Sequence, residues 1–250
     1  MSTLWDPQDF FDEDRLRQSS VFELFTGLKT VWEALARLEE VLTRRIAQER
    51  AKGTLRQGRV AEGAWIGPDV YVGPDAVVEP GAYIIGPAWI GRGAVVRHAA
   101  YIRENVWVCD GALVGHATEV KASVLLDRAQ APHFNYVGDS ILGFEVNLGA
   151  GTRLSNFKND GSEIIIRLDD GRQIPTGRRK LGAVLGDGVK TGCNAVANPG
   201  TLIGPGTLVY AGALLRGYVP GNSIVKVLPA QEIVPRERRG RVGLTGEGRA

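Results

Sequence analysis

The sequence predicts an all-β fold, a triangular solenoid of parallel β-coils, and three observations carry this prediction. Aliphatic residues recur with a strict six-residue period, a small or β-branched residue stands four places after each one, and glycine often stands one place after. A helix or an isolated strand does not need this combination, whereas a coil with one short strand per side and tight corners does. The periodic positions are Val60, Ile66, Val72, Val78, Ile84, Ile90, Val96, Ile102, Val108, Val114, Val120 and Leu126.

The same register returns at Leu142, Leu148 and Leu154, and again from Leu185 to Leu215. We therefore expect the solenoid to occupy residues 56–226, with two interruptions. Three hexads complete one coil, so the repeat predicts roughly seven coils stacked at the ~4.8 Å spacing of β-strands.

The segments on either side of the solenoid differ from it in composition. Residues 1–55 predict a helical segment, which either pairs with its copies around a three-fold axis or caps one end of the solenoid. Its apolar residues are Val21, Phe25, Leu28, Trp32, Leu35, Leu42 and Ile46. Residues 227–250 form an Arg- and Gly-rich tail that we expect to be a solvated end.

Composition indicates a soluble folded protein, with 44% hydrophobic and 23% charged residues and a formal net charge of +2. These values point to no nucleic-acid or membrane partner. The acidic N-terminus lacks the pattern of a secretory signal, so we expect a cytoplasmic location. Cys109 and Cys193 lie within repeats and are expected to be buried free thiols.

The first interruption, residues 127–140, contains Pro132 and a polar run, and we expect it to leave the solenoid as a loop. It holds His133, followed three residues later by Tyr136. A single histidine on a loop is usually only solvated, so this position alone does not decide between a catalytic and a solvated residue.

Two cations, Arg103 and Lys121, each follow an inward aliphatic residue and lie eighteen residues apart. They should stack about 5 Å apart on one face, where like charges repel. Either an anion such as phosphate lies between them, or a neighbouring acid such as Glu104 or Glu119 pairs with them.

Two histidines, His98 and His116, share the same eighteen-residue spacing and should also stack. Stacked imidazoles raise the alternative of a zinc site of the kind found in γ-class carbonic anhydrases. The closely spaced histidine pair of those enzymes is absent here, so we expect no metal.

The second interruption, residues 157–183, predicts an inserted β-hairpin with an Asp-Gly turn that stands away from the solenoid. It ends in Arg178, Arg179 and Lys180. These cations either bind phosphate groups or form a solvated basic turn.

The stretch from Tyr101 to Gly151 carries the motifs YIREN, EVK, HFNYVGDS and ILGFEVNLGAGT, and SN follows shortly after. These motifs resemble the acetyltransferase half of bifunctional glucosamine-1-phosphate N-acetyltransferase / N-acetylglucosamine-1-phosphate uridyltransferase, in the hexapeptide-repeat left-handed β-helix family. The resemblance implies left-handed coils, a homotrimer, acetyl-CoA as co-substrate and an amino-sugar 1-phosphate substrate, with glucosamine 1-phosphate leading. It places the protein in nucleotide-sugar biosynthesis.

The resemblance also implies roles for individual residues. His133 is the general base, and Arg103 and Lys121 hold the sugar phosphate. Tyr136, Asn147 and Asn156 position the sugar and its amine. Asn156 is expected to be a catalytic residue together with His133. Ala150 and Ala211 lie beside acetyl-CoA, in a groove between two subunits.

The chain departs from the family pattern at two places. Phe157 replaces a tyrosine, and a substrate-contacting lysine has no direct equivalent, although Lys158, Arg178, Arg179 or Lys180 are candidates to replace it. The residues before the repeats are too few for the uridyltransferase domain, and the sequence leaves open whether a separate nucleotidyltransferase partner supplies that activity. A non-catalytic sugar-phosphate-binding assembly or regulatory trimer therefore remains the alternative function.

Overall fold

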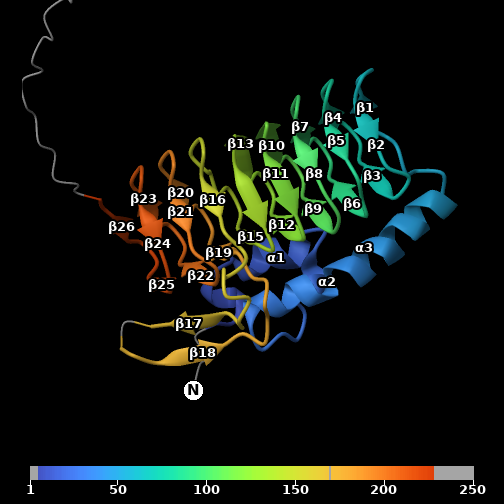
Figure 1. The fold of residues 1–250 in the computed structure, drawn as a ribbon. Helices are drawn as coiled ribbons and strands as arrows, with labels where there is room; N and C mark the ends of the chain where they lie inside the picture. The colour runs from blue at the N-terminus through green and yellow to red at the C-terminus, as the bar shows by residue number, and fades with distance from the viewer. Residues whose placement is uncertain (1–4, 169, 228–250) are drawn as a thin grey trace, which may run out of the picture.

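The fold is a parallel β-solenoid with one long side covered by helices and by a hairpin (Figure 1). The structure is a computed structural model, and it describes residues 5–168 and 170–227. The tail expected over residues 227–250 lies outside the described residues except for Val227. No helix among the described residues is both long and apolar enough to cross a membrane.

Three sheets of short parallel strands form the sides of the solenoid. Sheet A contains β3 (Val70–Val72), β6 (Ala88–Ile90), β9 (Val106–Val108), β12 (Ser123–Leu125), β15 (Ile141–Leu142), β19 (Ala183–Leu185), β22 (Thr201–Ile203) and β25 (Tyr218–Val219). Sheet B contains β1 (Arg59–Val60), β4 (Val77–Val78), β7 (Val95–Val96), β10 (Leu113–His116) and β13 (Gln130–His133), and continues through a bridge at Asn147 to β20 (Lys190–Thr191), β23 (Leu208–Val209) and β26 (Ile224–Val225). Sheet C contains β2 (Trp65–Ile66), β5 (Tyr83–Ile84), β8 (Tyr101–Ile102), β11 (Glu119–Lys121), β14 (Tyr136–Gly138), β16 (Arg153–Leu154), β21 (Val196–Ala197) and β24 (Leu214–Leu215).

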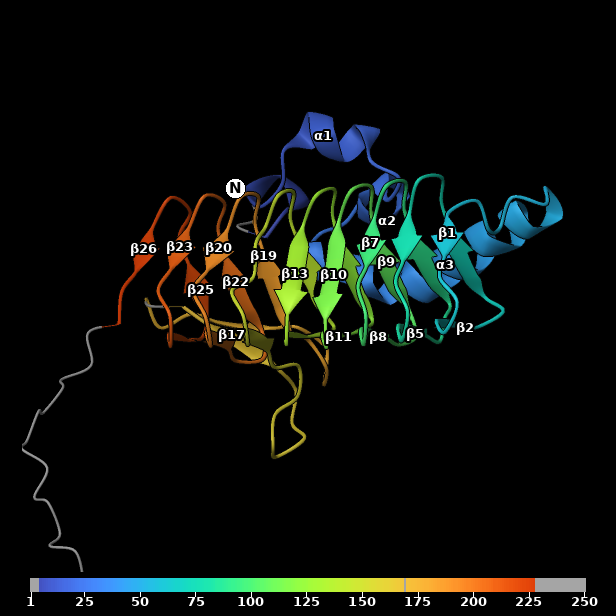
Figure 2. The same cartoon turned by 90° about the horizontal axis from the view of Figure 1, so that it is seen from above.

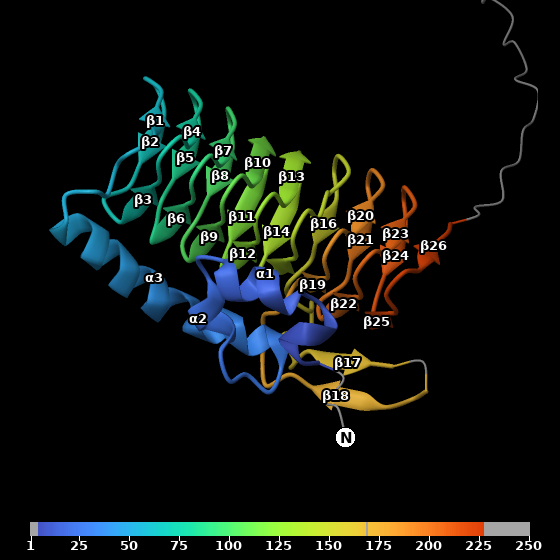
Figure 3. The same cartoon turned by 180° about the vertical axis from the view of Figure 1, so that it is seen from behind.

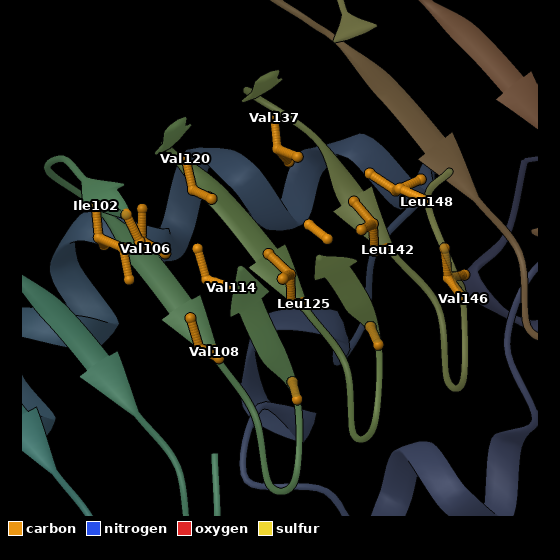
Figure 4. Packing of buried hydrophobic residues seen from close by; sticks show 14 of the residues in the cluster. Ile102, Val106, Val108, Val114, Val120, Leu125, Val137, Leu142, Val146 and Leu148 are labelled. Carbon is orange, nitrogen blue, oxygen red and sulfur yellow. The ribbon is translucent and has the colours of Figure 1, made fainter. Parts of the chain in front are cut away.

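The interior is filled by one aliphatic side chain from each strand, as the six-residue period predicts. Ile84, Ile102 and Val120 are completely buried and belong to one continuous core. Figure 4 shows residues of this core from the three sheets pointing toward one another. Burying such a side chain contributes roughly 1.5–3 kcal/mol, so a regular inward row stabilises every coil.

The solenoid has about nine coils rather than the roughly seven expected. The expected number is too low because residues 127–140 do not leave the solenoid. They form β13 and β14, which pair with β10 and β11 in the parallel sheets. Ala131 and Val137 take the inward positions there, so Pro132 and the polar neighbours occupy the outer surface and corners without breaking the coil.

The predicted register is also wrong at Leu126. Leu125 is the inward residue, and Leu126 packs with the helices outside. The step from Val120 to Leu125 is five residues long, and so is the step from Val137 to Leu142, which shortens the coil by one residue at the same corner.

The N-terminal helices lie along the outer side of sheet A, as Figure 3 shows. They are η1 (Pro7–Asp9), α1 (Glu13–Gln18), α2 (Phe22–Phe25), η2 (Val31–Glu33) and α3 (Ala34–Ala51). Their apolar residues pack against the outward side chains of sheet A, including Tyr71, Trp89 and Trp107. The expected end cap is therefore wrong, because the helices cover a side of the solenoid. Figure 2 shows α3 running along the first coils.

The predicted hairpin is confirmed, since β17 (Ile165–Arg167) and β18 (Gln173–Pro175) pair antiparallel. It does not stand away from the solenoid, however. Ile164 and Ile166 are 1% exposed and pack with Leu202 of sheet A. The hairpin therefore extends the outer layer over the last coils (Figure 1).

Candidate functional site

A buried polar network lies at the corner where sheet C turns into sheet A. The Lys121 Nζ atom lies 3.1 Å from Asp139 Oδ2, and the two side chains are 11% and 6% exposed. Asn156 donates a hydrogen bond from Nδ2 to the same carboxylate oxygen. The Tyr136 hydroxyl donates to Asn156 Oδ1 at 3.3 Å. The four side chains form one chain of contacts, which fixes the orientation of the Asn156 amide.

The two shortened steps in the coil build this corner. Ala122 and Asp139 turn the chain there with φ angles of +44° and +46°. The Asp139 N–H donates to the Lys121 carbonyl at 3.0 Å, which stacks the corners of successive coils. Gly138 leaves room for the network, because a Cβ there would lie 2.8 Å from both Asn156 Nδ2 and the Tyr136 hydroxyl.

The hydroxyl of Tyr136 is partly buried beside the ion pair of Lys121 and Asp139. Desolvation raises the pKa of Tyr136, and the nearby carboxylates of Glu119 and Asp139 raise it further. The hydroxyl therefore remains a hydrogen-bond donor at neutral pH.

Arg103 lies one coil before Lys121, as expected, and it is paired with acids. Its guanidinium lies 3.1 Å from Glu119 and 3.4 Å from Glu104. The hydrogen bond to Glu119 raises the pKa of Arg103. Of the two alternatives drawn from sequence, the neighbouring acids are therefore present. The repulsion between the two cations does not require a bound anion.

His133 lies at a different corner, where sheet B turns into sheet C. Its side chain is exposed, and its backbone N–H donates to Asn135 Oδ1 at 3.1 Å. Within residues 5–168 and 170–227, no hydrogen bond engages the imidazole, so both ring nitrogens face a ligand or solvent.

The strand register places Ala150, Cys193 and Ala211 after His133 at the same corner of successive coils. Because these three side chains are small, they place no bulky group on the solenoid surface along the edge that this corner forms beyond His133. The two alanines proposed to contact acetyl-CoA thus lie on the same edge as the proposed base.

Asn147 lies apart from the other sugar-binding candidates. It forms the bridge between β13 and β20 in sheet B. Within one chain, the structure thus brings Lys121, Tyr136 and Asn156 together, and leaves His133 and Asn147 on other parts of the surface.

The cations considered as replacements for the missing lysine have different environments. Lys158 donates to Ser162 and to the Glu163 carbonyl. Arg179 donates to the Gly161 carbonyl at 2.8 Å. Burial lowers the pKa of Arg178, and Asp139 acts in the opposite direction. Arg178 is therefore the hairpin cation that is electrostatically coupled to the polar network.

The remaining candidates divide between expected and unexpected positions. The His98 and His116 rings stack with centroids 4.4 Å apart, and His98 lies 3.2 Å from Glu79. No group of three metal-ligating side chains occurs among the described residues.

The two cysteines differ in exposure. Cys109 is buried, which raises the pKa of its thiol, but Cys193 is exposed, contrary to expectation.

Asp139 is the site residue that sequence reasoning missed. It lies eighteen residues after Lys121, but the strand register pairs Lys121 with Gly138, so Asp139 stands one residue beyond the stacked position. The eighteen-residue rule therefore does not find the pair, because the coil is one residue shorter here and residues 127–140 were expected to form a loop.

Part of the solenoid is similar to known proteins. Residues 84–203 match the family model described as the GMPPB C-terminal domain. This match covers slightly less than half of the chain and lies within the parallel β-solenoid.

Two relatives resemble part of the β-helix. One is a bifunctional sugar-1-phosphate nucleotidylyltransferase/acetyltransferase from Sulfurisphaera tokodaii, 40% identical over 107 residues, which cover 43% of this chain and 26% of that protein. The other is the bifunctional protein GlmU from Methanococcus maripaludis, 36% identical over 105 residues, which cover 42% of this chain and 25% of that protein. The match thus spans about a quarter of the length of these curated relatives.

Solved structures also align with the β-helix. The acetyltransferase domain of PglB from Neisseria gonorrhoeae, in complex with acetyl coenzyme A, is 18% identical, with a TM-score of 0.28, over 78% of this chain and 67% of that one. A UDP-N-acetylglucosamine acyltransferase from Francisella novicida is 13% identical, with a TM-score of 0.34, over 69% and 61%. At these values the alignments assign no role to any residue here.

Proposed function

We propose that this β-helix protein is an acetyl-CoA-dependent N-acetyltransferase of an amino-sugar 1-phosphate, with glucosamine 1-phosphate as the leading substrate. One observation supports it most: Tyr136, the first residue of β14, bonds to Asn156, Asp139 directly follows β14 and pairs with Lys121, and exposed His133 ends β13 three residues before Tyr136. The similarity to bifunctional sugar-1-phosphate nucleotidylyltransferase/acetyltransferases supports the same reaction class.

His133 would act on the amine of the sugar. An ammonium group has no free electron pair, so it must lose a proton before it can attack a carbonyl. An imidazole with a free ring nitrogen can accept such a proton as a general base. Its backbone is held by Asn135 and by Gly151, whose N–H donates to the His133 carbonyl at 3.0 Å.

Asn156 and Tyr136 would position the sugar. The Tyr136 hydroxyl and the Asp139 carboxylate hold the two ends of the Asn156 amide. A fixed amide can orient a sugar hydroxyl without paying for rotation of the side chain at each binding event. Lys121 and Arg103 would contribute positive charge nearby, reduced by the acids with which they are paired.

Acetyl-CoA would supply the activated acetyl group, and the edge formed by Ala150, Cys193 and Ala211 fits its approach. These side chains are small and follow His133 along one corner. Asn147 lies on sheet B, away from the polar network, so we include in the proposal a homotrimer in which a neighbouring copy completes the site. Light scattering after size-exclusion chromatography tests that assembly.

The deciding experiment measures thiol release from acetyl-CoA with glucosamine 1-phosphate and with galactosamine 1-phosphate. We expect turnover in the native chain and a loss of at least about 100-fold in His133→Ala, since general base catalysis is worth 10²–10⁴-fold. His98→Ala is the matched control, because His98 is also exposed and lies near the same edge. It should retain turnover within about twofold.

A non-catalytic sugar-phosphate-binding assembly is the second candidate, and one observation favours it. Phe157 replaces the family tyrosine beside Asn156 and is 42% exposed, and it bridges to Lys180 of the hairpin insertion. A trimer that binds the sugar phosphate but releases no thiol would establish this function in place of the acetyltransferase.

A further inference from the structure

A cleft of about 310 Å³ lies between the hairpin and the last coils of the solenoid. Its walls include Lys158, Ile165, Arg167, Asn198, Gly200 and Arg216. We refer to it as the hairpin cleft. It is separate from the network around Asp139, since neither Lys121, Asp139 nor Tyr136 lines it.

The charge of the hairpin cleft is strongly one-sided. Three of the residues that line the cleft are cations, and no lining residue is an Asp or a Glu. Another cleft, of about 400 Å³, shows the usual balance, with Arg15 and Arg128 facing Asp110 and Asp127. A concave surface lined by charge of one sign concentrates ligands of the opposite sign.

Two of the cations have no acid to neutralise them. Arg167 and Arg216 make no ion pair with any residue in the described part of the chain, and both side chains are exposed. Lys158 differs, because it donates to Ser162 and lies 3.8 Å from Asp160. The two guanidinium groups therefore retain their donors, in contrast to Arg103, which is paired with two carboxylates.

The cleft exists because glycines let the hairpin approach the coils. Gly200 and Gly217 have φ angles of +78° and +71°. A Cβ on Gly200 would lie 2.6 Å from Ile164, and one on Gly217 would lie 2.4 Å from the Arg167 carbonyl oxygen. The hairpin is thus seated closely on these corners, which fixes the wall that carries Arg167 opposite the coil that carries Arg216.

We infer that the hairpin cleft is a binding site for a phosphate-bearing ligand. Guanidinium groups recognise phosphate through paired, charge-assisted hydrogen bonds. The Asn198 side chain, which donates to the Leu215 carbonyl at 3.0 Å, adds an amide to the wall. Ile165, 37% exposed, offers apolar surface to the organic part of a ligand. This inference does not depend on acetyl transfer, because it concerns binding alone.

Calorimetric titration of the full chain with inorganic pyrophosphate tests the inference. We expect binding that weakens about tenfold or more in Arg167→Gln and in Arg216→Gln, as expected for the loss of a hydrogen bond to a charged group. Arg172→Gln is the matched control, since it removes the same charge from the hairpin at a residue already paired with Asp170. Circular dichroism checks that each variant retains its fold.

Three results would overturn the inference: no pyrophosphate binding by the native chain, an equal loss in Arg172→Gln, or a loss in Lys121→Gln with retention in Arg167→Gln and Arg216→Gln. The last result would assign the anion to the network around Asp139. A second titration with UDP distinguishes the sources of the phosphate. Binding tighter than that of pyrophosphate indicates a nucleotide that uses the Ile165 surface, and equal or weaker binding indicates that the cleft recognises the phosphate groups alone. Both of these outcomes support the phosphate site.

Discussion

The ammonium of Lys121 lies 3.1 Å from the carboxylate of Asp139, and both side chains are almost completely buried. The pair joins corners of successive coils at the point where each coil is one residue shorter than the hexad rule allows. A buried charge without its partner is costly, so the two residues stabilise the corner only together.

Breaking this pair should destabilise the protein strongly. We expect Asp139→Ala to lower the free energy of unfolding by about 3–5 kcal/mol, because it leaves the Lys121 ammonium buried and uncompensated. Urea unfolding followed by circular dichroism measures the effect. The double variant with Lys121→Met should be less destabilised than the sum of the single variants. Additive effects would show that the two charges do not interact.

The hydroxyl of Tyr136 should affect substrate binding more than folding. Tyr136→Phe removes the hydrogen bond to Asn156 and releases one end of its amide. We expect a loss of about two- to tenfold in kcat/KM for the amino-sugar phosphate, corresponding to one neutral hydrogen bond. Tyr101→Phe, on the same sheet and 38% exposed, is the control and should remain near the native value. Equal losses in both variants would argue against a specific role for Tyr136.

The helical layer should contribute much of its stability through Trp107. This residue is fully buried where the N-terminal helices meet sheet A. Trp107→Ala should cost about 3–5 kcal/mol in the free energy of unfolding, as expected for removal of a buried aromatic side chain. Trp65→Ala, which removes a tryptophan that is 45% exposed, should cost much less. Similar costs would mean that the helices add little to the fold.

The carboxyl of Asp127 should make stability depend on pH. Burial raises the pKa of Asp127 above its usual 3.8, and the nearby carboxylate of Asp110 raises it further. Because this pKa is higher in the folded state, the folded protein binds the proton more tightly than the unfolded chain. The contribution of Asp127 to the free energy of unfolding therefore falls as pH rises from about 3.8 through the folded-state pKa.

Asp127→Asn should remove this dependence, so the variant should gain stability relative to the native chain between pH 4 and pH 7. Urea unfolding at both values measures the difference. Glu62→Gln, at an exposed position, is the control and should show no such gain. A native-like pH dependence in Asp127→Asn would exclude this carboxyl as its source.

The candidate site was only partly predictable. Arg103 and Lys121 were placed correctly in successive coils, because their spacing equals one coil. Their partners were harder to predict, since Pro132 and the polar residues around His133 suggested a loop. In the structure Ala131 and Val137 keep the inward positions, Arg128, Gln130 and His133 are exposed, and Asn135, Asp139 and Ser140 are buried. A six-residue pattern of inward residues alone does not reveal that one coil is a residue shorter than the others.

The layer of helices over sheet A could have been predicted from outward-facing residues, which the six-residue period of inward residues does not include. Tyr71, Trp89 and Trp107 are large apolar residues eighteen apart at outward positions of sheet A. Such a row on a solvent-facing side would be unfavourable, so it indicates that another part of the chain covers that side.

By itself, the sequence determined the β-helix, because an inward aliphatic residue every six positions is satisfied only by coils with three short sides. It also determined the hairpin, whose two strands are adjacent in the chain. Only the tertiary structure decided that the helices and the hairpin cover sheet A, that Asp139 pairs with Lys121, and that Arg167 and Arg216 line one cleft. These contacts join residues far apart in sequence, and they depend on the exact length of each coil, which a repeating pattern of residue types does not specify.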